Sequence, residues 1–341
     1  MRVSVPLCAA AFLATAAVLP AAHAQDRKKL AQTTMKFLSV SVDPRAASLG
    51  DAVTAVEGLP TTLFYNPAGM ARQEAGVQLG LAQTQFIGDV DHNIAAATFA
   101  PSSGRYGVFG LSLQHVNYGE QIETIRANNA QGYDELGTFR PMAYAVGAGY
   151  AKALSDRFSV GGQVRYASMD LGNPVKSRST NGEIVTDDAT EGTLVYDFGM
   201  LYKTGFYGLN FAVAARNFAS QVAFATENNR LPLTLNIGVA VDAARAARLD
   251  PAVHSLTLAV DNNLAQDYDE QVRVGAEYGF MNTLFFRAGY VAPTDEKGIS
   301  LGLGVQRTLY GVGLGLDYAY TDFGDFNQFG RVHRAAVRFS F

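Results

Sequence analysis

Apolar and polar residues alternate along most of the chain that follows residue 75. Successive side chains of a β-strand point to opposite faces, so this alternation predicts strands with one apolar and one polar face. The alternating segments are about ten residues long, which is the length that a tilted strand needs to cross the hydrocarbon core of a membrane. We expect fourteen strands, near residues 76–86, 92–100, 106–118, 140–151, 157–169, 193–204, 207–217, 232–242, 253–264, 271–280, 284–291, 299–307, 310–320 and 333–341.

The tenth segment shows the pattern clearly. Its apolar residues Val272 and Val274 alternate with the charged residues Arg273 and Glu277. The segment 92–100 alternates poorly and has the weakest support of the fourteen. The quality of the pattern therefore varies, although the period of two recurs in most segments.

The connections between these segments are sorted by length. The longest follow the third, fifth, seventh and thirteenth strands, which are all odd-numbered, so they lie on one side of an antiparallel sheet. Bacterial outer-membrane barrels have an even number of strands, short periplasmic turns and longer outer loops. One longer connection, 243–252, departs from this rule. A soluble β-sandwich gives no reason for such sorting, so we interpret the chain as an all-β protein, a transmembrane antiparallel β-barrel.

The chain ends on an aromatic residue. In the last strand the apolar residues Val337, Phe339 and Phe341 alternate with Arg338 and Ser340. A terminal strand of this kind is typical of outer-membrane barrels. We expect its three apolar residues to form the signal that the barrel-assembly machinery binds.

The N-terminus has the features of an export signal. A basic residue precedes an apolar run over residues 3–20, and a small-x-small cleavage site ends at Ala24. We expect residues 1–24 to be a signal peptide and the mature protein to lie in the outer membrane of a Gram-negative type of cell. The single cysteine, Cys8, lies within this signal, so no disulfide is expected in the mature chain.

Composition and charge exclude several functions. Acidic residues (31) outnumber basic ones (27), and no basic tract is suited to nucleic acid. No uncharged apolar stretch after the signal is long enough for a membrane helix. The histidines are scattered singly and show neither metal-ligand nor catalytic spacing, so we expect no enzyme, no metal and no cofactor. Loop carboxylates near Asp267 and Asp322 could hold calcium, but solvated loop acids are the more ordinary interpretation.

If the apolar faces contact lipid, the polar faces line a lumen. Basic and acidic residues are balanced on those faces, which favours cross-strand ion pairs in a partly filled interior over an ion-selective pore. Unrelated solvated side chains are the alternative. The lumen-facing polar residues that we expect are Arg165, Asp197, Arg216, Asn236, Arg273, Glu277, Arg287 and Asp317.

The alternation fails between residues 25 and 75, where small residues and turn signals dominate. Asp43 and Pro44 are suited to begin a short helix, and Gly58 to end it. The Asn66-Pro67 pair predicts a turn in which the Asn side chain accepts a backbone hydrogen bond. Because backbone inside a lumen is shielded from lipid, we expect residues 25–75 to fold inward as a plug and residues 76–341 to form the barrel.

Two motifs in this segment resemble those of the PorV/PorQ group of outer-membrane proteins, which are related in fold to FadL-type channels. The stretch 44–52 looks like the group's "ARAA-aliphatic-GGA" motif, with Asp51 in place of the second Gly, and the stretch 64–71 looks like its "NPAGLA" motif. The motif residues that we select as candidate plug residues are Arg45, Ala46, Gly50, Asn66, Pro67, Ala68 and Gly69.

The resemblance implies a fourteen-stranded barrel with an N-terminal plug, and it implies a function. PorV-like members act with the type IX secretion machinery and carry cargo at the cell surface, whereas FadL-like relatives pass hydrophobic molecules through the barrel wall. We therefore expect a surface carrier of secreted proteins, with a channel for hydrophobic molecules as the alternative. The expected partners are outer-membrane lipid, the barrel-assembly machinery and either cargo with secretion components or a hydrophobic ligand.

Overall fold

The computed structural model describes residues 33–173, 175–178, 184–186, 189–224, 227–293, 298–324 and 331–341. The expected signal peptide, residues 1–24, lies outside the described residues.

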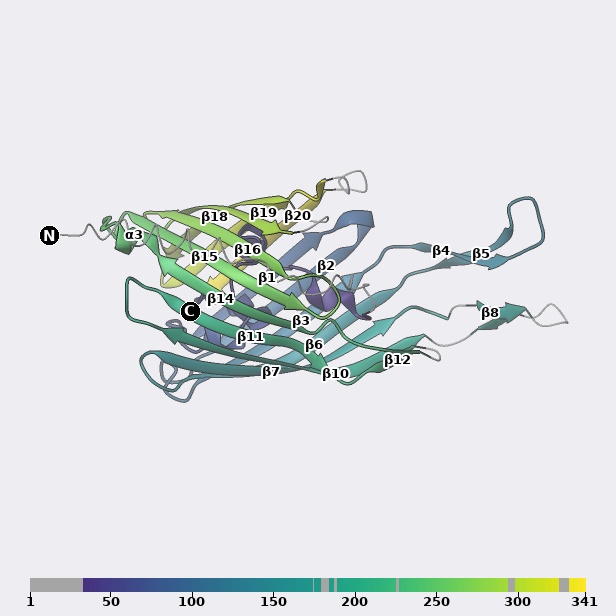
Figure 1. The fold of residues 1–341 in the computed structure, drawn as a ribbon, viewed down its shortest axis with the longest axis horizontal. Helices are drawn as coiled ribbons and strands as arrows, with labels where there is room; N and C mark the ends of the chain where they lie inside the picture. Colours follow the sequence, from purple (N-terminus) through teal and green to yellow (C-terminus); the bar gives the residue numbers. More distant parts are fainter. Residues whose placement is uncertain are drawn as a thin grey trace.

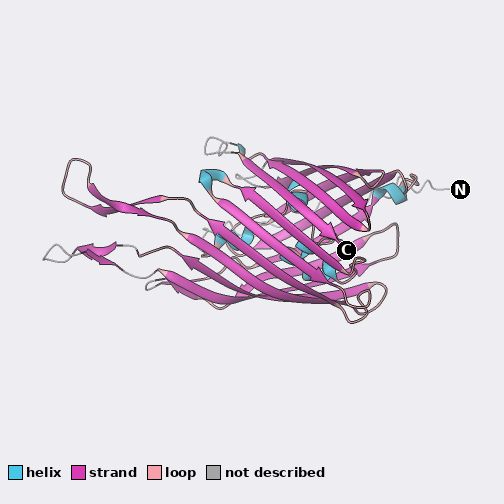
Figure 2. Cartoon of the chain, turned by 180° about the vertical axis from the view of Figure 1, so that it is seen from behind, coloured by secondary structure: helices cyan, strands magenta, loops and turns pink. Residues whose placement is uncertain are grey.

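Fourteen antiparallel strands close into a barrel (Figures 1 and 2), as the sequence predicts. Each predicted segment corresponds to one barrel strand, including the weakest one at 92–100. Neighbours in the wall are neighbours in the chain order, and β1 pairs with β20 to close the ring. The barrel strands are β1 (Val77–Gln85), β2 (Asp91–Phe99), β3 (Val108–Asn117), β6 (Met142–Ala153), β7 (Phe158–Asp170), β10 (Thr190–Lys203), β11 (Asn210–Ala219), β14 (Thr234–Asp242), β15 (His254–Ala265), β16 (Gln271–Phe280), β17 (Leu284–Ala292), β18 (Ile299–Leu309), β19 (Val312–Thr321) and β20 (Val332–Ser340).

The two faces of the wall differ as a membrane barrel requires. On β16, Val272 and Val274 are 45% and 47% exposed, whereas Arg273 and Glu277 are buried on the opposite face. The same alternation of exposed apolar and buried polar residues recurs in most strands. Exposed apolar side chains around a closed barrel contact hydrocarbon in a membrane, so the charged side chains face the interior.

The outer loops contain secondary structure that the sequence analysis treats as plain loop. Three of them form two-stranded hairpins, and Figure 1 shows that β4, β5 and β8 project beyond the end of the barrel. Among the described residues each hairpin pairs only within itself, and no residue of β4 or β5 is buried, so these two strands lack the regular alternation of the wall strands. The hairpins are β4 (Gln121–Arg126) with β5 (Tyr133–Phe139), β8 (Val175–Arg178) with β9 (Ile184–Thr186), and β12 (Val222–Phe224) with β13 (Glu227–Asn229).

Two of the connections between barrel strands hold a short helix. The outer turn between β1 and β2 holds the 3₁₀ helix η4 (Ile87–Asp89). The connection at 243–252, which departs from the length rule, holds the helical turn α3 (Ala243–Ala246), capped by Asp242. No helix in the described part of the chain is long and apolar enough to cross a membrane.

Residues 33–75, which we call the inner segment, lie within the ring of strands (Figures 1 and 2). Its helix α2 packs against β17, β18, β19 and β20, and its helix η3 packs against β6, β7 and β10 on another part of the wall. Most of its residues are buried, so the interior of the barrel is occupied by chain. Its helices are η1 (Lys36–Ser39), α2 (Pro44–Ser48), η2 (Pro60–Phe64) and η3 (Pro67–Met70).

The helix predicted after Asp43 begins as expected and ends early. The Asp43 side chain accepts a hydrogen bond from the backbone N–H of Ala46, and Pro44 occupies the first turn. The helix stops at Ser48, not at Gly58. Gly50 and Asp51 have φ angles of 63° and 61°, and two consecutive left-handed residues cannot continue an α-helix.

Candidate functional site: the interface between the inner segment and the barrel wall

Glycines on the inner face of the wall let the inner segment approach the strands closely. A methyl group on Gly199 would overlap the Asn66 side chain, and one on Gly161 would lie 2.6 Å from the backbone N of Ala68. Gly275 is equally close to Leu49. Only residues without a side chain fit at these positions, which explains why the polar faces of the strands are rich in glycine.

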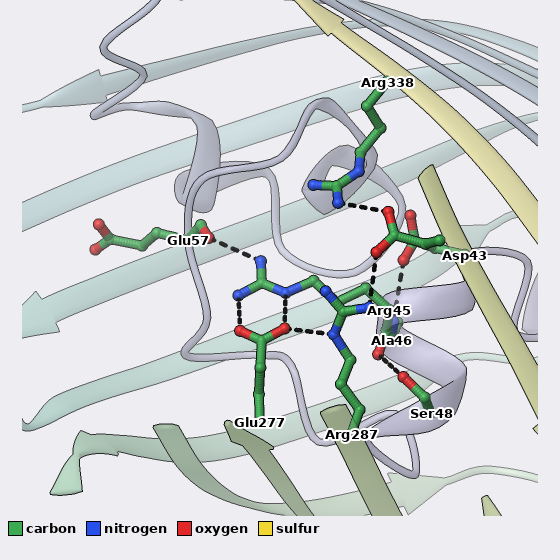
Figure 3. A network of polar contacts seen from close by, with 9 residues as sticks. Asp43, Arg45, Ala46, Ser48, Glu57, Glu277, Arg287 and Arg338 are labelled. Atoms are coloured by element: carbon green, nitrogen blue, oxygen red, sulfur yellow. Dashed lines mark hydrogen bonds and ion pairs between the residues drawn. The ribbon is translucent and has the colours of Figure 1, made fainter. Parts of the chain in front are cut away.

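Charged side chains link the α2 region to the wall (Figure 3). Arg45 donates two hydrogen bonds to the Glu277 carboxylate, at 2.8 Å and 2.7 Å. Arg287 also donates to Glu277 and reaches Asp317 at 2.7 Å, and Arg338 pairs with Asp317. The result is a chain of five alternating charges, four of which belong to strands β16, β17, β19 and β20. We call it the Arg45 network.

The Arg45 network is almost fully enclosed. The side chains of Glu277, Arg287 and Asp317 are each 8% exposed or less, and that of Arg45 is 16% exposed. Burial alone would lower the pKa of Arg45, but the charge of Glu277 and its hydrogen bonds outweigh burial and raise this pKa. Each side chain of the network thus pairs with one or two neighbours of opposite charge, and a buried charge depends on such partners for compensation.

A second buried polar cluster joins β7, β10 and β11. Arg165 pairs with Asp197 at 2.8 Å and donates to the Asn217 side chain at 2.7 Å. The backbone N–H of Asn217 donates to the same Asp197 at 2.8 Å. All three side chains are 3% exposed or less, so the cluster is a fixed part of the wall.

Asn66 makes the turn hydrogen bond that the sequence predicts. It also makes two side-chain hydrogen bonds that the sequence does not predict. Its side-chain oxygen accepts from the backbone N–H of Ala68 at 3.0 Å. Its side-chain nitrogen donates to the carbonyl of Thr54 at 2.8 Å and to that of Met200 on β10 at 3.3 Å. Asn66 therefore closes a turn, joins two parts of the inner segment and attaches them to the wall.

A polar cluster around Tyr65 fixes the middle of the inner segment. The Tyr65 hydroxyl accepts from the backbone N–H of Asp43 at 3.2 Å, and Ser41 donates to Asp51. Burial raises the pKa of Tyr65, and the nearby Asp51 and Asp43 carboxylates act in the same direction. From the wall, Arg334 donates to the carbonyl of Ser41 at 3.0 Å. The left-handed Asp51 is thus held by contacts that a glycine could not make.

The remaining candidate residues make contacts of different kinds. The Arg216 guanidinium stacks over the Tyr65 ring of the inner segment at 5.4 Å, and Asn236 accepts a hydrogen bond from Asn263 of the wall. Arg273 makes long hydrogen bonds of 3.4 Å, to Tyr268 and Gln271. Gly69 donates its backbone N–H to the carbonyl of Asn66.

At the C-terminus, Val337 faces Leu81 and Phe339 faces Leu79 of β1 across the seam where β20 pairs with β1, and Phe341 is exposed.

Gly313 and Gly315 of β19 make room for neighbouring side chains of β20. A methyl group on Gly313 would contact Ser340, and one on Gly315 would contact Arg338.

The inner segment has two further ionic contacts with the wall, one near each end of the barrel. Lys36 pairs with Asp267, in the loop after β15, at 2.6 Å. Glu57 pairs with Lys203, at the end of β10, at 2.7 Å. The sequence analysis did not find Lys36, Glu57 or Arg334, because nothing in their local sequence distinguishes them from solvated charges.

The polar contacts of the interface hold the inner segment in place. Within the described part of the chain, no group of three or more His, Cys, Asp or Glu side chains is arranged to bind a metal ion. Asp267, which the sequence analysis considered for calcium, bonds to Lys36 and Thr33. The charges of the Arg45 network are used in mutual pairing.

Comparisons with known proteins agree with this architecture. Among solved structures, the toluene transporter TbuX of Ralstonia pickettii is similar, with a TM-score of 0.57, 13% identity and coverage of 87% of this chain and 97% of that chain. The toluene transporter TodX of Pseudomonas putida has a TM-score of 0.54, 11% identity and coverage of 87% and 96%. Likeness at such low identity shows the fold alone. No curated protein matches the chain.

A family model, described as type IX secretion system protein PorV, matches residues 22–246. The match covers more than half of the chain and includes the inner segment, with both of its motifs, and the first eight barrel strands. With its closed fourteen-stranded barrel and FadL-like fold, the chain is an outer-membrane β-barrel that belongs to the PorV family.

Proposed function

We propose that this protein is a carrier for secreted proteins at the outer membrane and that it acts with components of a type IX secretion system. The family match supports this role, and so does the occupied interior of the barrel. In this proposal the inner segment acts as a plug and residues 1–24 direct export. The barrel-assembly machinery binds the C-terminal residues Val337, Phe339 and Phe341.

The occupied lumen is the observation that carries the proposal. The inner segment is tied to the wall near both ends, through Lys36 with Asp267 and through Glu57 with Lys203. The Arg45 network fixes it between these points. Because the inner segment occupies the interior, in this proposal a protein partner meets the barrel on its outside.

The hairpins offer a surface for that contact. Within the described part of the chain the β4 and β5 strands pair only with each other, so no strand described there neighbours either outer edge of the hairpin. Ile122 and Tyr133 on this hairpin are 62% and 40% exposed. Open strand edges and exposed apolar residues are features that protein partners bind.

Gene deletion with complementation tests this function. We expect deletion to leave proteins with type IX sorting domains inside the cell, and the full-length gene to restore their export. A variant in which a short Gly-Ser linker replaces residues 121–139 should insert into the membrane and fail to restore export. A variant with Glu135→Gln, an exposed hairpin substitution, is the matched control. Complete export and anchoring of all cargo in the deletion strain would rule out the carrier role.

A channel for hydrophobic molecules is the second candidate. The similarity of fold to two toluene transporters favours it, as does an apolar cluster in the lumen that includes Met35, Phe37 and Leu38 of the inner segment. Transport would require these side chains to move. Uptake of labelled fatty acids and apolar compounds in the deletion strain tests this role, and unchanged uptake would remove its support.

A further inference from the structure

The wall is interrupted between the strands β11 and β14. Their ladder runs from Asn210 paired with Ala240 to Arg216 paired with Thr234 and stops there, although β11 continues to Ala219. By contrast, β3 is paired with β6 over its whole length and with β2 over all of its residues but Val108. Beyond this point Phe218 and Ala219 have a ladder partner on the β10 side only, and Asn217 has none on either side.

A β-bulge produces the interruption. Arg216 and Asn217 together oppose the single residue Asp197 of β10, and Asn217 has a left-handed φ of 61°. A bulge of this kind bends its strand and ends pairing, and such features are common beside functional sites.

Side chains hold the bulge in this form. Asn217 donates from its side chain to the carbonyl of Pro232 at 3.1 Å, across the gap in the ladder. On the other side, the Arg165 and Asp197 pair binds Asn217 from β7 and β10. Asn217 is 1% exposed. These hydrogen bonds hold the interruption of the wall in place, and the buried Arg165–Asp197 ion pair supports it from β7 and β10.

A cavity of about 260 Å³ lies at the interruption. It is lined by Asn217, which faces the interior, and by Phe218, which faces outward and is 57% exposed. Because both faces of β11 contribute, the cavity lies within the wall. Leu231 and Leu233 give it apolar lining, and Arg230 places an exposed guanidinium at its edge.

The cavity lies near the outer boundary of the membrane. Phe218 is eight residues from the start of β11 at the short-turn end, which is about 26 Å along the strand. With the usual tilt, this corresponds to a height of roughly 20 Å, near the upper limit of the apolar band of a barrel. Backbone N–H and C=O groups that lack a ladder partner at such a depth need another polar partner.

We propose that this wall cavity binds one phosphorylated acyl lipid of the outer leaflet. The lipid phosphate lies on Arg230, and an acyl chain passes over Phe218. Arg230 forms no ion pair with any residue that the structure describes, and guanidinium groups bind phosphate through two parallel hydrogen bonds. Its backbone carbonyl accepts from Thr34 of the inner segment at 2.9 Å, which fixes its position. This site is independent of the carrier role.

Native mass spectrometry of the detergent-extracted full chain tests the site. The probes are lipid A with its phosphates, lipid A without them, and inorganic phosphate. We expect one phosphorylated lipid per chain, with binding about tenfold weaker for Arg230→Gln, because a charge-assisted hydrogen bond is lost. Arg126→Gln, on the β4–β5 hairpin, should bind the lipid as the unmodified chain does.

A second pair of variants tests the acyl contact. Phe218→Ser should weaken lipid binding. Phe211→Ser, at a lipid-facing position of the same strand away from the cavity, should not.

Several results would overturn the proposal. Equal binding by Arg230→Gln and the unmodified chain would exclude the phosphate contact. Equal binding of lipid A with and without phosphate would exclude recognition of the head group. Inorganic phosphate that binds as tightly as the lipid would exclude the acyl contact. Because Arg230 is exposed, its substitution should leave the fold intact, and heat-dependent gel mobility verifies that each variant is folded.

Discussion

Glu277 compensates two guanidinium groups that are themselves largely buried, Arg45 of the inner segment and Arg287 of β17. Glu277→Gln keeps the size of the side chain and removes its charge, so both guanidinium groups lose their shared partner. We expect the free energy of unfolding to fall by about 3 kcal/mol, as is typical when one member of a buried ion pair is removed. The urea midpoint measured from gel mobility checks this, with the exposed Glu135→Gln as control. Equal midpoints for the two variants would contradict the role of Glu277.

Gly199 tests the close approach of the inner segment to the wall. Its missing side chain leaves the space that Asn66 occupies. Gly199→Ala should therefore push Asn66 away from its contacts and destabilise the barrel by roughly 1–3 kcal/mol. Gly76→Ala, where the added methyl group would have only an ordinary contact at 3.6 Å, should change stability little. Thermal unfolding in detergent measures both, and a neutral Gly199→Ala would show that the contact is loose.

At the scale of elements, β11 should not behave as one rigid strand. The residues 210–215 belong to ladders on both sides, whereas 218 and 219 have a ladder partner only in β10. We expect slow amide hydrogen exchange over 210–215 and measurably faster exchange at 218 and 219. Exchange followed by mass spectrometry of overlapping peptides measures this difference. Uniform protection along β11 would mean that the wall closes at this point.

The barrel strands were predictable because each has one face in lipid and one in the interior, which imposes a period of two on the sequence. The segment at 92–100 tested the limit, since the apolar Ile94 and Ala96 are buried on the inner face and the polar Asn93 is exposed on the outer face, which weakens the contrast between the faces. The hairpin β4–β5 has no buried face and therefore no comparable pattern. The early end of α2 depended on Gly50 and Asp51, and the sequence alone did not show that Asp51 would adopt a left-handed conformation.

At the scale of the whole molecule, the sequence predicted which polar residues face inward better than it predicted their partners. Arg45 and Glu277 are separated by 232 residues, and only the folded barrel brings them together. The same holds for Lys36 with Asp267 and for Glu57 with Lys203. Charge balance on the inner faces indicated pairing, but the pairs that include the inner segment depend on its path through the lumen, which no periodic pattern encodes.

The central claim is that the inner segment occupies the lumen and is tied to the wall near both ends. Zero-length carbodiimide cross-linking of the unmodified protein in intact outer membranes tests it directly, because two native lysines lie within 2.7 Å of carboxylates across the interface. Peptide mass spectrometry should find amide bonds between Lys36 and Asp267 and between Lys203 and Glu57, and Lys203→Arg should remove the second bond alone. Absence of both cross-links, with the same lysines linked elsewhere or labelled as free amines, would place the segment outside the barrel and contradict the account.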